Sequence, residues 1–315
     1  ALDASPVLGD DPARATALSA RGLARRYQGR IDEACDDFER ARDMAHRCGD
    51  ARGEAEAIER LGSAVALLGD LNGGEALHRD ALARYEALGD LRGRGALRSL
   101  LGVTRMHRDG ARREAADDLR AAAALLREAG DPFAENVNLL RLVAVDLELG
   151  ALDACEAAVA TLLSNCDAVG DASTARMARG YLAVVRHLLG HLDDAQLRYE
   201  RAVEEGRAVA VPQFEATYAS YLALLHIERG AYELARDAAA RAFEVTAPVG
   251  DPRIESFARA ALAMSDAALG RIDAAREGIA AVKALLAPRT LADYPRIVEA
   301  VEAARSLADA SRAAD

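Results

Sequence analysis

Glycine recurs at a nearly constant interval along the chain, and this regularity limits the possible folds more than any other feature. Seven glycines are separated by 40 or 41 residues: Gly29, Gly69, Gly110, Gly150, Gly190, Gly230 and Gly270. A Gly-Asp dipeptide lies about midway between them, beginning at Gly9, Gly49, Gly89, Gly130, Gly170 and Gly250, and it is missing only near Ala210. A fixed period of this length is typical of stacked copies of one supersecondary unit. Each copy is too small to enclose a site, so we expect function on a surface shared by neighbouring copies.

The residues between successive glycines predict two helices in each period. After Gly170, Asp171 can cap a helix start, and apolar residues then recur at helical spacing as far as Leu188. Gly190 is expected to end this helix, because the residue beyond a helix C-terminus often needs a positive φ. Asp193 is predicted to start the second helix of the pair.

Each predicted second helix carries a small residue and, four positions later, usually a large one. The small residues are Ala34, Gly74, Ala115, Cys155, Ala195, Ala235 and Ala275. The large ones are Phe38, Leu119, Val159, Tyr199 and Ile279, with His78 and Ala239 as exceptions. The first helix of one period carries Ile58, Leu61, Gly62 and Val65. Together these residues resemble the tetratricopeptide repeat (TPR), whose second helix reads A-x₃-F and whose first helix contains Leu-Gly.

The repeating unit is six residues longer than the usual 34 of a TPR. Long units punctuated by Gly-Asp look like the TPR variant in the C-terminal sensor regions of bacterial MalT-like and related signal-transduction ATPase (STAND) regulators. The resemblance implies an all-α fold, a right-handed α-solenoid of about seven helix-turn-helix repeats over residues 10–289. Residues 290–315 are expected to form a capping helix with a polar outer face.

The first residues of the chain align with the end of a later repeat. Residues 1–9 match the segment before Gly250-Asp251, which is the predicted tail of a second helix. We therefore expect residues 1–9 to be the tail of a preceding repeat, in a longer protein that carries an effector domain upstream.

Composition and charge exclude several classes of partner. The net charge is −11 and the isoelectric point about 5.2, so nucleic acid and anionic membrane surfaces are not expected partners. The sequence has no apolar run near eighteen residues and no signal-peptide pattern, which favours a cytoplasmic location. The four cysteines (Cys35, Cys48, Cys155 and Cys166) have no metal-ligand spacing and are predicted to be small packing residues.

No group of residues has the pattern of a catalytic site. His187 and His191 are four residues apart near two aspartates, but Gly190 should separate them, so loop histidines are favoured over metal ligands. The acidic pairs on the predicted second helices are expected to be solvated: Asp36-Asp37, Asp117-Asp118 and Glu204-Glu205. The glycine-rich stretches lack the Gly-Lys-Ser/Thr of a phosphate-binding loop. We therefore expect that the protein is not an enzyme and that it binds neither a cofactor nor a metal.

The family resemblance implies that the first helices line the concave side and that ligands lie there. When the ligand-facing positions of the family's first helices are assigned to the equivalent positions of these repeats, they predict a binding groove. It comprises Val137, Leu140, Arg141, Met177, Tyr181, Val184, His187, Tyr221, Leu224, Ile227, Phe257 and Met264. Tyr181 and Tyr221 are one period apart and are expected to stack, and Arg141 occupies the same place one period earlier. About half of the set is expected to be inter-repeat core. Gly180 lacks a side chain, so it either leaves room for a ligand to approach the helix or is a tolerated glycine with no such role.

An apolar stripe with two tyrosines and one arginine suits a peptide or an amphipathic helix. The leading prediction is a non-enzymatic scaffold or sensor module that binds a protein or peptide, within a larger bacterial signalling protein. The alternative is a small-molecule sensor, because MalT-like superhelices bind an inducer inside their turn.

Overall fold

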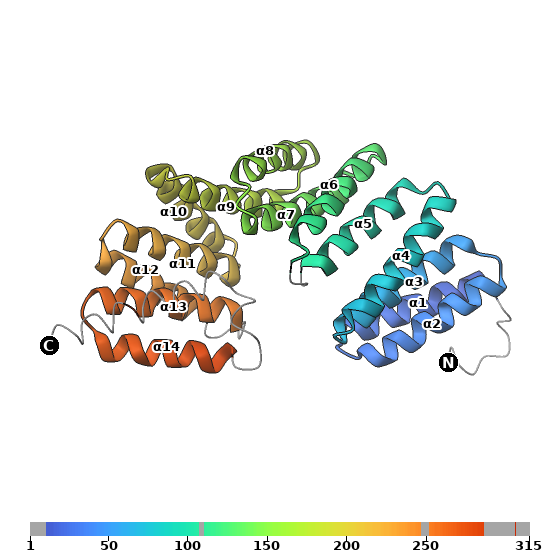
Figure 1. Ribbon diagram of the computed structural model, residues 1–315, viewed down its shortest axis with the longest axis horizontal. Helices are drawn as coiled ribbons and strands as arrows, with labels where there is room; N and C mark the ends of the chain where they lie inside the picture. Colours follow the sequence, from blue (N-terminus) through green and yellow to red (C-terminus); the bar gives the residue numbers. More distant parts are fainter. Residues whose placement is uncertain (1–10, 107–109, 247–251, 287–305, 307–315) are drawn as a thin grey trace. The chain divides into compact units, whose positions relative to one another are not determined.

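The computed structural model describes residues 11–106, 110–246, 252–286 and Ser306. Within these residues the chain forms fourteen α-helices in antiparallel pairs, which confirms the prediction of about seven helical hairpins (Figure 1). The chain divides into two compact units, residues 1–174 and residues 175–315, with the boundary in the first turn of α9. We call them unit 1 and unit 2.

Unit 1 contains four helix pairs. They are α1 (Pro12–Tyr27), α2 (Ile31–Arg47), α3 (Ala51–Leu67), α4 (Leu71–Ala87), α5 (Leu91–Met106), α6 (Arg112–Glu128), α7 (Pro132–Glu148) and α8 (Leu152–Val169). Unit 2 contains three further pairs. They are α9 (Ala172–Leu188), α10 (Leu192–Ala208), α11 (Pro212–Glu228), α12 (Tyr232–Thr246), α13 (Pro252–Ala268) and α14 (Ile272–Leu286).

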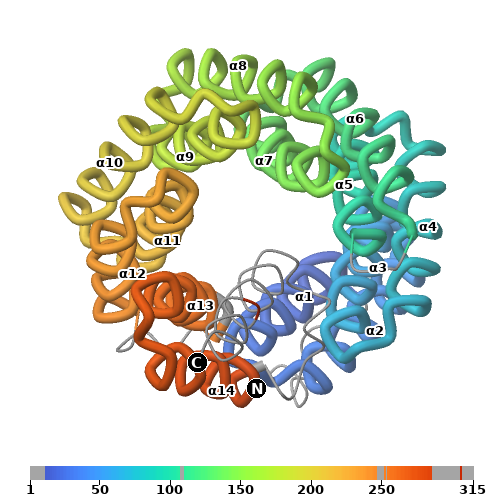
Figure 2. The backbone as a smooth tube through the Cα atoms, turned by 60° about the vertical axis from the view of Figure 1, so that its left-hand side comes forward, coloured from blue at the N-terminus to red at the C-terminus, as the bar shows by residue number. Residues whose placement is uncertain are grey.

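The two helices of each pair belong to different layers. Within each unit the odd-numbered helices follow one another in one layer and the even-numbered helices lie in the other (Figure 2). First helices of successive pairs touch directly, as α1 does with α3 and α11 with α13. A residue at one position of the repeat therefore has its counterpart from the next repeat beside it on the same face.

The periodic glycines end the helices in the predicted way. Gly190 follows α9 with a φ of 79°, a left-handed conformation that glycine adopts without steric cost. Ala210 occupies the slot that lacks glycine, and it keeps the same conformation with a φ of 53°. A Cβ atom makes this conformation unfavourable, so the repeat geometry imposes it on Ala210.

The helix starts agree only in part with the prediction. Asp171 caps α9 by accepting a hydrogen bond from the Thr174 N–H at 3.1 Å, as predicted. Asp193 is not a cap: α10 begins at Leu192, and the capping residue His191 makes no side-chain bond to the helix. Asp193 instead lies in the first turn, where a negative charge interacts favourably with the helix dipole.

The small and large residues of the second helices pack as the TPR resemblance implies. Ala34 and Cys155 are fully buried, and Phe38 is buried against Gly22 of the paired first helix. A Cβ atom on Gly22 would lie 2.7 Å from Phe38 Cε1, so the glycine makes room for the ring. His78 takes the place of Phe38 in the second pair, opposite Gly62.

The predicted end segments fall largely outside the described residues. This applies to the tail at residues 1–9 and, apart from Ser306, to the capping helix at residues 290–315. Among the described helices, none combines the length and the apolar character needed to cross a membrane.

Candidate functional site

In unit 1 the predicted groove residues lie along one face of α7. Val137 is exposed, with 45% of its surface accessible, and Leu140 and Arg141 are half-buried. The guanidinium of Arg141 donates a hydrogen bond from Nη1 to the Ser99 hydroxyl on α5 at 2.7 Å. Arg141 thus bridges two neighbouring first helices.

In unit 2 the predicted residues of α9 differ in exposure. Met177 has 43% of its surface accessible, whereas Tyr181 and His187 are half-buried and Val184 is buried. Met177 and Tyr181 therefore reach the surface of the first-helix layer. Val184 belongs to the interior of the unit.

The predicted residues of α11 and α13 lie at the edge of the core. Phe257 is buried in a cluster with Ala260, Ala263, Ile279 and Val282. Tyr221, Leu224 and Met264 pack against this cluster and remain half-buried, as does Ile227. Tyr221, Leu224 and Met264 therefore contribute both to the core and to the surface.

Two tyrosines outside the predicted set form the base of this region. Tyr199 of α10 is fully buried, and its ring stacks on Tyr221 with 5.9 Å between centroids and an angle of 5° between planes. Tyr218 also stacks on Tyr199, at 6.4 Å, and Tyr221 meets Phe257 edge-on at 4.9 Å. Burial raises the pKa of Tyr218 well above its usual value, so this phenol stays neutral. The stacked rings fix the position of Tyr221.

Gly180 has a packing role that the sequence did not reveal. A Cβ atom at this position would lie 2.1 Å from Tyr218 Cζ, so the glycine of α9 accommodates the tyrosine of α11. The close approach comes from the protein's own ring and accounts for the glycine without a ligand.

His187 is not a loop residue, contrary to the sequence prediction. It lies in the last turn of α9, and its Nδ1 is 3.2 Å from the Tyr199 hydroxyl. Its Nε2 is 2.9 Å from the Glu228 carboxylate at the end of α11. His187 therefore connects three helices of unit 2.

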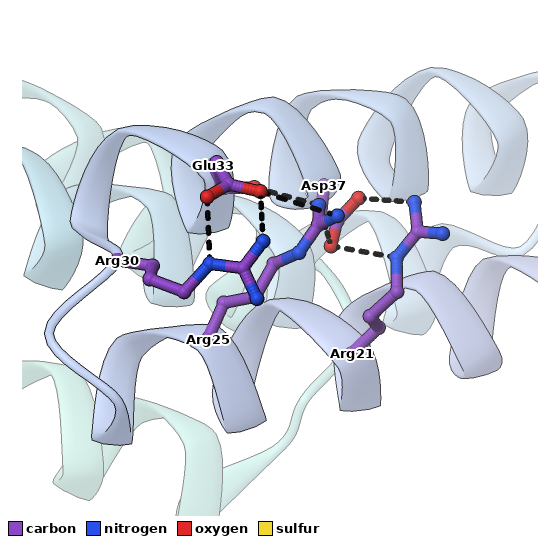
Figure 3. A network of polar contacts seen from close by, with 5 residues as sticks. All are labelled: Arg21, Arg25, Arg30, Glu33 and Asp37. Carbon is purple, nitrogen blue, oxygen red and sulfur yellow. Dashed lines mark hydrogen bonds and ion pairs between the residues drawn. The ribbon is translucent and has the colours of Figure 1, made fainter.

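The acidic pairs of α2 and α6 are not fully solvated, and this corrects a second prediction. Asp36 and Asp117 are exposed, but Asp37 and Asp118 are buried between the helices of their pairs. Asp37 accepts hydrogen bonds from Arg21 and Arg25 of α1, at 2.6 Å and 2.7 Å (Figure 3). The second acid of each pair faces the first helix, where arginines neutralise its charge.

Asp118 has the same environment two repeats later. Arg98 and Arg105 of α5 both pair with its carboxylate, and Arg105 also reaches Glu75 of α4 at 3.3 Å. The periodic sequence offered a signal for these networks, because Arg25 and Arg105 are 80 residues apart at equivalent positions.

No family model and no curated protein matches this chain. Among solved structures, a STAND protein with a tetratricopeptide repeat sensor from Pyrococcus horikoshii superposes with a TM-score of 0.73 at 18% identity. The match covers 94% of this chain and 44% of that one, so the chain spans less than half of that protein.

Two other solved structures have the same kind of repeat. The apo quorum sensor NprR from B. thuringiensis gives a TM-score of 0.67 at 17% identity, covering 88% of this chain and 77% of that one. A Rap protein in complex with Competence and Sporulation Factor gives 0.62 at 13% identity, with coverage of 90% and 75%. The similarity confirms the TPR-like fold.

Proposed function

We propose that the chain is a non-enzymatic peptide-binding module and that a peptide lies on the first helices of unit 2. The observation that carries the proposal is the row of accessible or half-buried side chains Met177, Tyr181 and Tyr221, backed by the buried ring of Tyr199. Aromatic side chains supply large contact area, and rings already held in place lose little freedom when a ligand binds.

The comparisons support a sensor role. One similar structure is a Rap protein complexed with Competence and Sporulation Factor, another is a quorum sensor, and a third is a STAND protein with a tetratricopeptide repeat sensor. The proposed module would belong to a larger bacterial signalling protein and would act in the cytoplasm. An effector domain in the same polypeptide would convert peptide binding into a response.

A binding experiment with defined variants tests the proposal. A pool of random hexapeptides is equilibrated with the protein across a dialysis membrane, and retained peptides are identified by mass spectrometry. Met177→Asp places a charge on the exposed part of the row and should weaken retention by about tenfold, the effect of losing one apolar contact and burying a charge. Met177 suits this test better than Tyr221, because truncating Tyr221 would also open the core.

The matched control is Leu197→Asp on α10. Leu197 has 66% of its surface accessible and lies on a second helix, so its substitution should leave peptide retention unchanged. Equal retention by the Met177 variant and the unmodified protein would contradict the proposal. The small-molecule alternative is supported if no peptide is retained, and if a metabolite raises the melting temperature of the unmodified protein but not that of the Met177→Asp variant.

A further inference from the structure

Arg141 is the starting point, because its partner is a neutral hydroxyl. Its contact within the described residues is the bond from Nη1 to the Ser99 hydroxyl, and it pairs there with no carboxylate. A guanidinium has five N–H donors, so one bond to a hydroxyl leaves most of its capacity unused.

Three half-buried arginines on the first helices of unit 1 pair with acidic residues. Arg60 pairs with Glu56 at 3.2 Å, Arg98 with Asp118 at 3.1 Å, and Arg105 with both Asp118 and Glu75. Arg141 is half-buried like them but lacks an acidic neighbour. Partial burial lowers the pKa of Arg141 below its usual value, and no nearby acid opposes this effect.

Aliphatic residues occupy several positions close to Arg141 in the sequence and in the repeat register. Val137 and Leu140 flank it on α7, and Leu100 and Val103 occupy the neighbouring register positions on α5. All four side chains are half-buried or exposed. A ligand that reached the guanidinium would therefore lie on aliphatic carbon next to one positive charge.

We propose that Arg141 binds a carboxylate of a peptide ligand, with an apolar side chain of the same ligand on Val137 and Leu140. This inference rests on the proposed peptide-binding function and adds a cationic anchor in unit 1. A carboxylate can accept two parallel N–H bonds from one edge of the guanidinium while Nη1 keeps its bond to Ser99. Lysine at this position would retain the charge but lose the paired geometry.

Small probes test the anchor directly. N-acetyl-leucine carries a main-chain carboxylate, N-acetyl-glutamic acid α-amide carries a side-chain carboxylate, and N-acetyl-leucinamide is neutral. Binding is followed by NMR through the methyl signals of Val137. We expect saturable shifts with the two acids, and the tighter one identifies which kind of peptide carboxylate the site prefers. The neutral amide should bind about tenfold more weakly, in line with the loss of a charge-assisted pair.

Three variants complete the experiment. Arg141→Gln should weaken N-acetyl-leucine binding by about tenfold and Arg141→Lys by several-fold, whereas Arg60→Gln should have no effect. Equal binding of the amide and the acid, unchanged binding by Arg141→Gln, or no Val137 shift with any probe would overturn the inference. Failure of the proposed function is seen separately, as peptide retention that does not depend on Met177.

Discussion

The two units use one backbone repeat but fill the space next to the large residue of a second helix with different chemistry. In unit 1, Asp37 and Asp118 directly precede Phe38 and Leu119, and both are buried against arginines of the first helix. In unit 2 the residue before Tyr199 is Arg198, which pairs with Asp194 on its own helix at 2.9 Å. The space next to Tyr199 is filled by Tyr218 and Tyr221 instead.

This difference shows what the period controls. The glycines and the small residues of the second helices fix where the helices turn and how closely they approach. They leave the large positions free, so buried ion pairs lie next to Phe38 and Leu119, whereas stacked rings lie next to Tyr199. The stacked rings support the ligand surface proposed for unit 2, whereas in the ion pairs of unit 1 the arginines and the acids neutralise one another.

The largest expected effect comes from breaking the network of unit 1. Asp37→Ala leaves Arg21 and Arg25 without their buried carboxylate and should lower the local free energy of unfolding by about 3 kcal/mol. Hydrogen exchange of segments from α1 and α2 measures this local stability. Asp36→Ala, at the exposed neighbour, should change it by less than about 0.5 kcal/mol. Equal effects of the two substitutions would contradict a structural role for the network.

A smaller effect is expected from crowding the rings of unit 2. Gly180→Ala inserts a methyl group that overlaps the ring of Tyr218, and should cost about 2 kcal/mol in the local stability of α9 and α11. Tyr218→Leu in the same chain should recover part of this loss, because it removes the overlapping atoms. A double-mutant cycle followed by hydrogen exchange measures the coupling. Additive effects would show that the two residues do not compete for the same space.

Lowering the pH should reduce the free energy of unfolding of each unit, because each unit contains a buried histidine. Burial lowers the pKa of His78 in unit 1 and of His226 in unit 2, from an ordinary value of 6.5. The unfolded chain then takes up protons first, so stability is fully present above pH 6.5 and is lost as the pH falls below it. His78→Phe restores the residue type of Phe38 and should flatten this dependence in unit 1 only.

Urea unfolding at several pH values between 7 and about 5.5 checks this prediction, with hydrogen exchange to assign the change to a unit. Glu59 titrates in the opposite sense, because burial raises its pKa. Glu59 is present in both the His78→Phe variant and the unmodified chain, so its contribution cancels when their pH dependences are compared. An unchanged pH dependence in the variant would exclude His78 as the source.

The smallest expected effect concerns the slot that lacks glycine. Ala210→Gly should stabilise unit 2 by about 1 kcal/mol, because it relieves a left-handed alanine. The reverse substitution in unit 1, Gly170→Ala at a φ of 71°, should destabilise by a similar amount. Thermal unfolding of the two variants measures the sign of each change in stability. Destabilisation by Ala210→Gly, or stabilisation by Gly170→Ala, would show that the turn geometry is not set by the repeat.

The sequence predicted the helices well because the signals for them are local. Glycines with positive φ, caps such as Asp171 and helical spacing each involve residues close in the chain. The burial of Asp37 was missed because its arginine partners are 12 and 16 residues away on another helix. Tyr218 was missed because it lies outside the predicted groove, and nothing near Gly180 in the sequence indicates a ring 38 residues further on.

The native methionines offer the most direct test of where a ligand binds. The chain has four: Met44 and Met106 in unit 1, and Met177 and Met264 on the first helices of unit 2. Methyl-labelled methionine gives one NMR signal for each, and a retained hexapeptide is added to the protein. The account predicts shifts at Met177 and Met264 with no change at Met44, which is buried in unit 1. A shift at Met44 with Met177 and Met264 unchanged would contradict it.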